Sequence, residues 1–369
     1  IDPKTGKALT PFKPVWSGTG GRYVEGSHIY KKDGYYYLLC SEGGTELAHS
    51  LTIARSRNIY GPYESNPDNP IMTNCRAKGQ DKQIQGTGHG DFVQAKDGSW
   101  WIVFLAYRNM GGSYHHLGRE TCLAPVEWRK GEWPVIYGGE AIDTLMTTKL
   151  LPQHSYPSKP MRFTEDDPAW VYLQNPDSSK YQWMTPKQGD ESEKSKGELS
   201  KIKVLRLYGS ESSLTQNNRP TYIGRRQEAE QITCEVCVDL HQQTKLEAGI
   251  SVYQINDGHY DLFVENNKDT GLIVGLRYQV KGLPVNTVVG YADQMGHSVK
   301  RPVYLRVQSA DNLYVFSYSF DGKNYQKISA LPSTLLSTEV VGGFTGVTLG
   351  MYACGNGYAD FTKWKYEEN

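Results

Sequence analysis

Glu25 is the residue of this chain whose type and setting most suggest acid–base chemistry. It lies in the run VEGSH at 24–28, directly before an apolar segment, where a glycine allows the backbone to wrap closely. A carboxyl group in such a setting can act as a general acid, provided that it stays protonated at the working pH. Residue type alone favours the alternative of a surface charge, because most glutamates are exposed.

Two hairpins of the same design lie 64 residues apart. The pair Asp-Gly at 33–34 is followed by YYYLL at 35–39, and the pair Asp-Gly at 97–98 is followed by SWWIVF at 99–104. A tight Asp-Gly turn between an apolar and an aromatic strand is typical of a β-hairpin. The recurrence predicts an all-β array of similar units arranged around a common axis.

The same offset of 64 residues relates Glu25 to His89, and it carries the run ARS at 54–56 onto GRE at 118–120. In a radial array, equivalent positions on the innermost strands face the same axis. We therefore predict that Glu25 and His89 point at one central site.

Length and composition bound the class of protein. The 369 residues are enough for two domains. The 40 Lys and Arg residues balance 40 Asp and Glu residues, so we predict neither nucleic acid nor a membrane surface as a partner. No apolar run reaches the ~20 residues that span a bilayer. The 26 Tyr and 8 Trp residues suit packing within blades, the commoner use, and also stacking on sugars.

The sequence divides into two parts. Residues 1–142 carry the repeated hairpins, and residues 143–165 contain three prolines and indicate a connector. Over 166–369, short alternating strands recur at roughly ten-residue spacing, which is typical of a β-sandwich. The charged run 187–197 is predicted to be a surface loop. We predict no long helix.

Other residues with catalytic or metal-binding potential give weaker signals. The six cysteines are predicted to be buried free thiols. Cys234 and Cys237 have CxxC spacing, but they lie in a predicted strand where residues i and i+3 face opposite sides, which argues against a redox or zinc site. The adjacent residues His115 and His116 should not share a metal for the same reason.

The motifs of the first half, taken in order, resemble the propeller of the family-43 glycoside hydrolases. Those of the second half resemble the β-sandwich appended to that family's β-xylosidases, so the resemblance covers nearly the whole chain. It implies an all-β fold, with the C-terminal blades of a five-bladed β-propeller over 1–142, followed by a concanavalin-like β-sandwich. The motifs are VEGSH (24–28), YYYL (35–38), SEGGT (41–45), ARS (54–56), GPYE (61–64), GTGHGD (86–91), LGRET (117–121), LRL (205–207), GRRQ (224–227), AGI (248–250), FTG (344–346) and ADF (359–361).

The resemblance implies that Glu25 is the general acid of an inverting hydrolase. Two aspartates, a general base and a residue that tunes the acid, lie N-terminal to the glutamate in the family. Here only Asp2 precedes Glu25, and its context matches neither motif. The chain also does not begin with Met. We therefore expect it to be the C-terminal portion of such an enzyme, incomplete as a catalyst by itself.

Two further site residues are implied on the blades. Arg119 matches the arginine that reaches the substrate at the bottom of the pocket, the alternative being a salt bridge with Glu120 or Glu127. His89 matches a histidine on the channel axis that holds a water or a calcium ion. The alternative, a hydrogen-bonded core histidine, nearly coincides with that role. No other metal and no required cofactor are implied.

Thr45 and Phe344 complete the expected site. Thr45 follows two glycines and matches a position near the active site, with a simple turn residue as the equal alternative. Phe344 lies in the run GGFTG at 342–346 and matches a loop that the sandwich sends toward the pocket. A phenylalanine on so flexible a loop is expected to be held by burial of its ring, which contributes roughly 1.5–3 kcal/mol.

The resemblance implies an exo-acting β-xylosidase that releases terminal xylose from xylo-oligosaccharides or arabinoxylan fragments. An α-L-arabinofuranosidase of the same family is the nearest alternative, because both sugars are pentoses. A carbohydrate-binding protein without catalysis is the alternative from another class, since the base is not found in this sequence. A homo-oligomer is compatible with each of these hypotheses.

Overall fold

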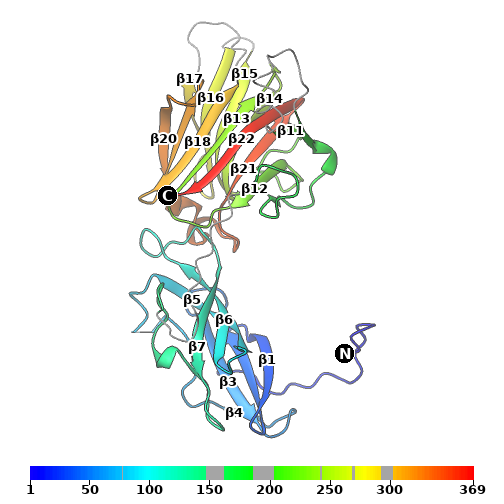
Figure 1. Ribbon diagram of the computed structural model, residues 1–369, viewed down its shortest axis with the longest axis vertical. Coiled ribbons are helices and arrows are strands. Elements are labelled where there is room, and N and C mark those ends of the chain that lie inside the picture. The colour runs from blue at the N-terminus through cyan, green and yellow to red at the C-terminus, as the bar shows by residue number, and fades with distance from the viewer. Residues whose placement is uncertain (77, 147–161, 186–202, 242, 268–270, 292–301) are drawn as a thin grey trace. The chain divides into compact units, whose positions relative to one another are not determined.

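The computed structural model divides the chain into two compact units (Figure 1). The blade unit comprises Ile1–Asn109 and Arg119–Ser155, and the sandwich unit comprises Met110–Gly118 and Tyr156–Asn369. The structure describes residues 1–369 except 77, 147–161, 186–202, 242, 268–270 and 292–301. The predicted connector is therefore largely outside the described residues, and the charged run 187–197 is wholly outside them.

The blade unit contains two four-stranded antiparallel sheets. The strands follow one another across each sheet in sequence order, β1 to β4 in the first and β5 to β8 in the second, which is the arrangement of propeller blades. The elements are β1 (Glu25–Lys32), β2 (Tyr35–Glu42), β3 (Ser50–Ser56), β4 (Glu64–Ser65), β5 (Ile84–Gln94), β6 (Trp100–Arg108), β7 (Glu120–Glu127), β8 (Val135–Ile136) and the 3-10 turn η1 (Tyr137–Gly139).

Both predicted Asp-Gly hairpins are present. Asp33 and Gly34 join β1 to β2 with φ values of 51° and 77°, and positive φ at both central residues is what a type I′ turn requires. Gly98, with φ of 87°, turns the chain between β5 and β6, and its N–H donates to the Ala95 carbonyl at 2.9 Å. Local sequence therefore specifies the first hairpin of each blade.

The two blades share one hydrophobic core. Alternate residues of β2 and β6, such as Leu39 and Phe104, are buried in the same cluster. The ring of Trp128 lies at its centre, with centroid distances of 4.9 Å to Tyr37 and 5.1 Å to Phe92. Such aromatic pairs each contribute about 0.5–1.5 kcal/mol beyond the area they bury. The core thus includes Ile84 and Phe92 of β5 and packs against Tyr30 of β1, the strands from which His89 and Glu25 come.

Two seven-stranded antiparallel sheets build the sandwich unit. Their strand orders are β10-β11-β22-β13-β18-β19-β20 and β17-β16-β15-β14-β21-β12-β9. The strands are β9 (Val171–Tyr172), β10 (Tyr181–Met184), β11 (Val204–Tyr208), β12 (Thr221–Arg226), β13 (Ile232–Asp239), β14 (Leu246–Ile255), β15 (Gly258–Asn267), β16 (Gly271–Val280), β17 (Asn286–Tyr291), β18 (Val303–Ala310), β19 (Leu313–Ser319), β20 (Gln326–Pro332), β21 (Thr348–Gly355) and β22 (Tyr358–Glu368).

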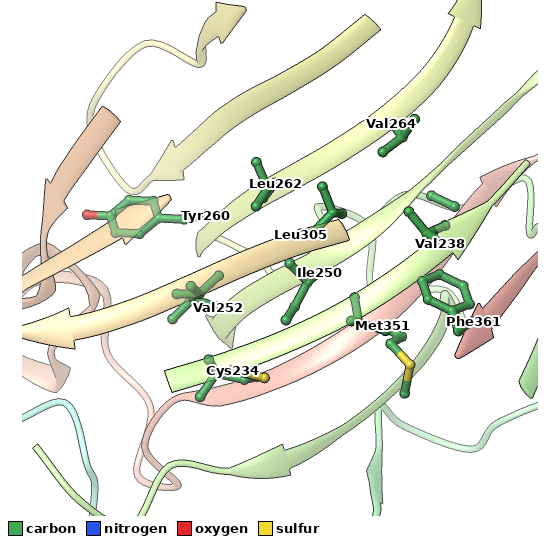
Figure 2. Packing of buried hydrophobic residues seen from close by; sticks show 14 of the residues in the cluster. Cys234, Val238, Ile250, Val252, Tyr260, Leu262, Val264, Leu305, Met351 and Phe361 are labelled. Atoms are coloured by element: carbon green, nitrogen blue, oxygen red, sulfur yellow. The ribbon is translucent and has the colours of Figure 1, made fainter. Parts of the chain in front are cut away.

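The sandwich core forms where the inner faces of these sheets meet (Figure 2). Leu305 and Phe361 of one sheet point toward Ile250 and Met351 of the other, and all four are fully buried. This follows from period-two alternation, which sends every second residue of a strand to the inner face. Cys234 also lies in this core, and it is a free thiol.

Helical structure is short in the described part of the chain. Besides η1, it comprises the 3-10 turns η2 (Ser178–Lys180) and η3 (Ser333–Leu336) and the α-helical turn α2 (Thr338–Val341). None of the described helices is long and apolar enough to cross a membrane.

The predicted blade region, residues 1–142, is interrupted by the segment Met110–Gly118. This segment belongs to the sandwich unit, although the strands on both sides of it in sequence are blade strands. It connects β6 to β7. The side chains of His116 and Leu117 are each no more than 1% exposed. Burial, together with the charge of His115, lowers the pKa of His116 to about 4, so its ring is neutral at pH 7. The His116 ring packs edge-on against Tyr314 of β19, with centroids 6.0 Å apart.

Candidate active site

Glu25 is the first residue of β1 and is exposed. It pairs with Ser41 of β2, and the register shifts between Glu25 and His28, which marks a β-bulge. Gly26 within the bulge has φ of 58°, a conformation that favours glycine. Bulges re-aim side chains at the ends of strands, and this one sets the direction of the Glu25 carboxyl group.

His89 of β5 lies beside this bulge. A Cβ atom added at Gly26 would be 3.2 Å from both Cε1 and Nε2 of the His89 ring, so the ring faces the Gly26 backbone. The His89 N–H donates to Ser41 Oγ at 2.7 Å, which ties β5 to β2 directly opposite Glu25. The structure therefore brings together the two residues that the 64-residue offset related.

His49, which the sequence did not single out, forms the buried floor of this cluster. Its side chain is fully buried, and its Nδ1 lies 2.9 Å from the Gly86 carbonyl oxygen. Because a carbonyl can only accept, Nδ1 carries the proton, and Nε2 presents a lone pair. A Cβ at Gly88 would lie 2.5 Å from this ring, so the backbone just before His89 rests on His49.

The electrostatic surroundings of His49 show which groups share the site. Burial lowers its pKa, the hydrogen bond to Gly86 opposes that effect, and the charges of His89, Glu25 and Arg119 all act on it. Glu25 raises the pKa, whereas His89 and Arg119 lower it. The charge of Arg119 thus acts on the same buried histidine as those of Glu25 and His89.

Arg119 is exposed and directly precedes β7. Of its alternative partners, Glu120 is held at two points by Arg108, with N–O distances of 2.6 and 2.7 Å, and Glu127 lies 3.8 Å from Arg129. These contacts give each carboxylate another arginine as neighbour.

Glu42 is a second residue that the sequence analysis missed. Its carboxylate is 2% exposed and accepts four hydrogen bonds, from the N–H and Oγ1 of Thr19, the N–H of Gly21 and Oγ1 of Thr52. A Cβ at Gly21 would lie 2.5 Å from Oε2, so the chain leading to Glu25 wraps around this carboxylate. Burial raises the pKa of Glu42, but the hydrogen bonds from Thr19, Thr52 and Gly21 outweigh it and hold the pKa below its usual value.

Thr45 is half-buried in the turn after β2. The preceding Gly44 has φ of 71°, and a Cβ there would lie 3.1 Å from the Tyr23 ring. Thr45 therefore lies beside the chain that enters β1, which fits both the turn residue and the site residue.

Phe344 lies in the sandwich unit, in the loop after α2, and its side chain is 55% exposed. It is not part of the sandwich core, and burial of its ring at the sugar pocket stays a prediction. Backbone contacts hold the end of the loop, since the Val347 N–H donates to the His116 carbonyl at 2.8 Å.

Among the described residues, no three His, Cys, Asp or Glu side chains gather into a set that could hold a metal ion. A calcium ion at His89 would need water or sugar oxygens as its other ligands. A pocket of about 740 Å³ in the blade unit is lined by Lys78, Tyr137 and Glu140 among others, and it includes neither Glu25 nor His89.

Comparison with known proteins identifies the family of this chain. Residues 1–134 match the glycosyl hydrolases family 43, and residues 164–367 match the β-xylosidase C-terminal concanavalin A-like domain. The chain belongs to glycosyl hydrolase family 43. The prediction of an all-β chain, with propeller blades followed by a concanavalin-like sandwich, is confirmed.

Relatives within family 43 carry two kinds of name. The chain is 36% identical over 366 residues to a non-reducing-end α-L-arabinofuranosidase of Bacteroides ovatus, covering 98% of this chain and 64% of that protein. It is 31% identical over 396 residues to a xylan 1,3-β-xylosidase of a Vibrio species, covering 100% and 69%. The solved structure of the Bacteroides ovatus xyloglucan PUL protein GH43B has a TM-score of 0.86 at 34% identity, covering 100% of this chain and 70% of that chain. This chain thus spans somewhat less than two thirds of the length of the arabinofuranosidase.

The Glu42 carboxylate should stabilise the blade unit in a pH-dependent way. Since its folded pKa is depressed, its contribution is present above the unfolded value of about 4.5 and is lost as the pH falls through the folded pKa. We expect E42Q to lower the free energy of unfolding by roughly 2–3 kcal/mol at pH 7, because the amide nitrogen faces hydrogen-bond donors, and by much less at pH 3.

The free energy of unfolding of the blade unit, obtained from denaturant titrations of both proteins at pH 7 and pH 3, measures this effect. Glu64 provides the control, because its side chain is 67% exposed and only 3.4 Å from Arg55, so E64Q should change little at either pH. Equal losses for the two variants at pH 7 would show that the buried hydrogen bonds of Glu42 do not stabilise the unit.

Proposed function

We propose that the protein is an exo-acting glycoside hydrolase that releases a terminal pentose, with Glu25 as the proton donor. The observation that carries the proposal is the cluster of Glu25, His89 and Arg119 around the buried His49. A carboxyl group, an imidazole and a guanidinium at one point supply an acid and fixed donors for sugar hydroxyls. Membership of family 43 supports hydrolysis of a glycosidic bond as the reaction.

In this mechanism the residues of the chain have separate tasks. Glu25 gives its proton to the glycosidic oxygen as the bond from that oxygen to C1 breaks. Arg119 donates hydrogen bonds to the sugar hydroxyls, and His89 holds the strand β5 against the bulge of β1. His49 is kept neutral by burial, so it adds no positive charge beside Glu25.

The proposal includes inversion at C1, in which a base-activated water attacks from the face opposite the leaving group. Asp2 does not supply such a base, because its carboxylate accepts hydrogen bonds from Lys4 N at 2.9 Å and Thr5 Oγ1 at 2.8 Å in a local turn. In this proposal the chain therefore supplies the general acid, Glu25, and none of its residues is assigned as the general base.

Between the two pentoses, we propose β-xylosidase activity on xylo-oligosaccharides, with α-L-arabinofuranosidase activity as the alternative. The names of the relatives favour neither decisively, since the Vibrio protein is a xylosidase and the Bacteroides protein an arabinofuranosidase. Parallel assays of an aryl β-D-xyloside and an aryl α-L-arabinofuranoside distinguish the two.

The 369-residue chain by itself should hydrolyse an aryl β-xyloside slowly or not at all, because none of its residues has been matched to the base. Sodium azide should restore turnover, since the anion needs no deprotonation. It attacks C1 from the face opposite the leaving phenolate, so that a C1–N bond forms as the C1–O bond breaks. The measurement is phenolate release with and without azide, together with identification of the α-xylosyl azide.

Rapid hydrolysis in the absence of azide would contradict this expectation and require a base within the chain or from another subunit. Binding of pentose with no turnover in either condition would instead favour the hypothesis of a carbohydrate-binding protein.

E25Q should lose most activity on xylosides with poor leaving groups, by roughly 10²–10⁴-fold, because their leaving oxygen needs the proton. Activated aryl xylosides should lose much less. The measurement is kcat/KM across a series of leaving groups, in azide where azide is required. Glu46 is an exposed glutamate of the same unit, 2.7 Å from Arg22, so E46Q serves as the matched control. A loss of the same size for every leaving group would mean that Glu25 is structural.

A further inference from the structure

The pocket of about 740 Å³ in the blade unit has no part in the proposed reaction, because neither Glu25 nor His89 lines it. Its volume falls within the range of small-molecule sites. The lining residues come from three stretches of chain: 78–82 before β5, 125–127 at the end of β7, and 137–143, which begins with η1. All three stretches belong to the blade unit, so the pocket is formed within one compact unit.

Two buried amide side chains hold two of these stretches in place. Asn74 accepts the Ile142 N–H at 3.0 Å and donates to the Ile142 carbonyl at 2.8 Å. Gln85 donates to the carbonyls of Gly79 and Lys82, at 2.7 and 2.9 Å. Asn74 and Gln85 are each 1% exposed, so water competes little for these bonds. The walls therefore have a defined path before a ligand arrives, which lowers the entropy lost on binding.

Tyr137 presents its ring from a turn of unusual backbone conformation. Its φ is 47°, in the left-handed region that bulky residues rarely adopt, and Gly138 and Gly139 follow with φ of 62° and 79°. The Glu140 N–H closes the turn on the Tyr137 carbonyl at 3.0 Å. The half-buried side chain packs against the blade core and also lines the pocket. A tyrosine ring held in this way can stack on the C–H groups of a sugar while its hydroxyl stays hydrated.

The lysines of the pocket are paired with its carboxylates. Lys78 Nζ lies 3.0 Å from Glu140 Oε1, and Lys82 Nζ donates to Asp143 Oδ2. The hydrogen bond and the charge of Asp143 raise the pKa of Lys82, and Tyr137 adds to this effect, so the tyrosine lies near the second pair. Because each lysine already has a carboxylate partner, the pocket offers no uncompensated lysine to a phosphate or another anion.

The lining favours a neutral ligand rich in hydroxyl groups. An ammonium beside a carboxylate provides a donor and an acceptor at one point, and each hydroxyl of a sugar both donates and accepts. Pro125, Val126 and Ala141 add apolar surface for the C–H groups of such a ligand. Among the residues that the structure describes, no set of His, Cys, Asp or Glu side chains could hold a metal ion here instead. A sugar chain thus matches both the polar and the apolar parts of the lining.

We propose that this pocket is a carbohydrate-binding site separate from the Glu25 site, which holds a chain of neutral sugars without cleaving it. Tyr137 stacks on one sugar ring, and the two ion pairs bond to hydroxyl groups of the chain. The choice of xylose as the sugar rests on the proposed function, whereas the site itself does not depend on Glu25 acting as an acid. The blade unit thus binds sugar at two places.

Titration of the isotope-labelled chain with xylohexaose, followed by nuclear magnetic resonance, tests the site directly. We expect the amide signals of Gly138 and Gly139 to shift with increasing xylohexaose and to saturate, because both residues follow the stacking ring. The amide of Gly61, in the loop between β3 and β4, should stay unchanged and serves as the control. R119Q alters a residue assigned to the Glu25 site, so it should leave the shifts at Gly138 and Gly139 as they are.

Two variants of the lining test what holds the sugar. Y137N removes the ring but keeps a residue that tolerates positive φ. K82M removes the ammonium group but keeps much of the length of the side chain. We expect each variant to raise the dissociation constant for xylohexaose, read from the Gly138 shift, by about tenfold or more, since a few anchoring groups carry most of the binding energy. Y60N is the matched control, because Tyr60 is a tyrosine of the same unit that is 65% exposed and does not line the pocket.

The titrations can contradict the proposal in three ways. Absence of a saturable shift at Gly138 and Gly139, or equal affinity in Y137N, K82M and the unaltered chain, would show that the pocket does not hold the sugar. Loss of the shifts in R119Q would show that they arise from binding at the Glu25 site. Shifts with inorganic phosphate but not with xylohexaose would make the pocket an anion site. Should Y137N not fold, K82M decides the second point alone.

The outcome for this pocket is distinct from that for the proposed function. Saturable shifts at Gly138 that are weakened by K82M, together with no turnover of an aryl xyloside in azide, would support this site while the proposed function fails. Turnover in azide without any shift at Gly138 would have the opposite meaning, and the proposal of a separate carbohydrate site would then be wrong.

Discussion

The contact between the His89 ring and the backbone of Gly26 is the constraint on which the site depends. It joins the first strand of one blade to the first strand of the next, at the bulge that directs Glu25. The contact is possible because position 26 has no Cβ and adopts a positive φ. His49 repeats the arrangement one layer below, where its ring lies against Gly88. At both places an imidazole ring packs against the backbone of a glycine, where a larger residue would leave no room for the ring.

Local signals made much of the fold predictable. The two-residue Asp-Gly turn at 33–34 fixes its own backbone angles and the register of β1 and β2, so this hairpin follows from the sequence. At 97–98 the same pair lies in a three-residue loop, because the Ala95 N–H donates to the Ser99 carbonyl across it. Period-two alternation in the second half likewise specifies which residues enter the sandwich core, as with Ile250 and Leu305 in Figure 2. The offset of 64 residues paired Glu25 with His89 because equivalent strands of a repeat face the same way.

The residues that the sequence did not reveal are those defined by distant partners. His49 takes its role from the Gly86 carbonyl, 37 positions away, and Glu42 from Thr19, 23 positions away. Glu42 lies within the motif SEGGT at 41–45, but the resemblance gave a role there only to Thr45, and His49 lies in none of the quoted motifs. For the same reason the sequence did not show that Met110–Gly118 belongs to the sandwich unit. Its carbonyl groups accept hydrogen bonds from donors more than a hundred positions later in the chain.

The sandwich unit also contains a segment that the chain forms between two blade strands. A β-sandwich appended to a catalytic domain is readily taken for a separate binding module. Here it receives a segment from between two strands of a blade and bonds three of its carbonyls in succession. Its short helix α2 and the glycine-rich loop after it serve this attachment, which explains why glycine is needed at positions 118 and 346.

The titration of His49 is the most direct measure of whether Glu25, His89 and Arg119 form one site. Nuclear magnetic resonance can follow the imidazole of His49 in the unaltered chain, in E25Q and in R119Q. If the charges converge as described, loss of the Glu25 anion lowers the pKa of His49, and loss of the Arg119 cation raises it. A His49 pKa that is the same in all three proteins would show that these residues are not gathered around it, and the account of the site would be wrong.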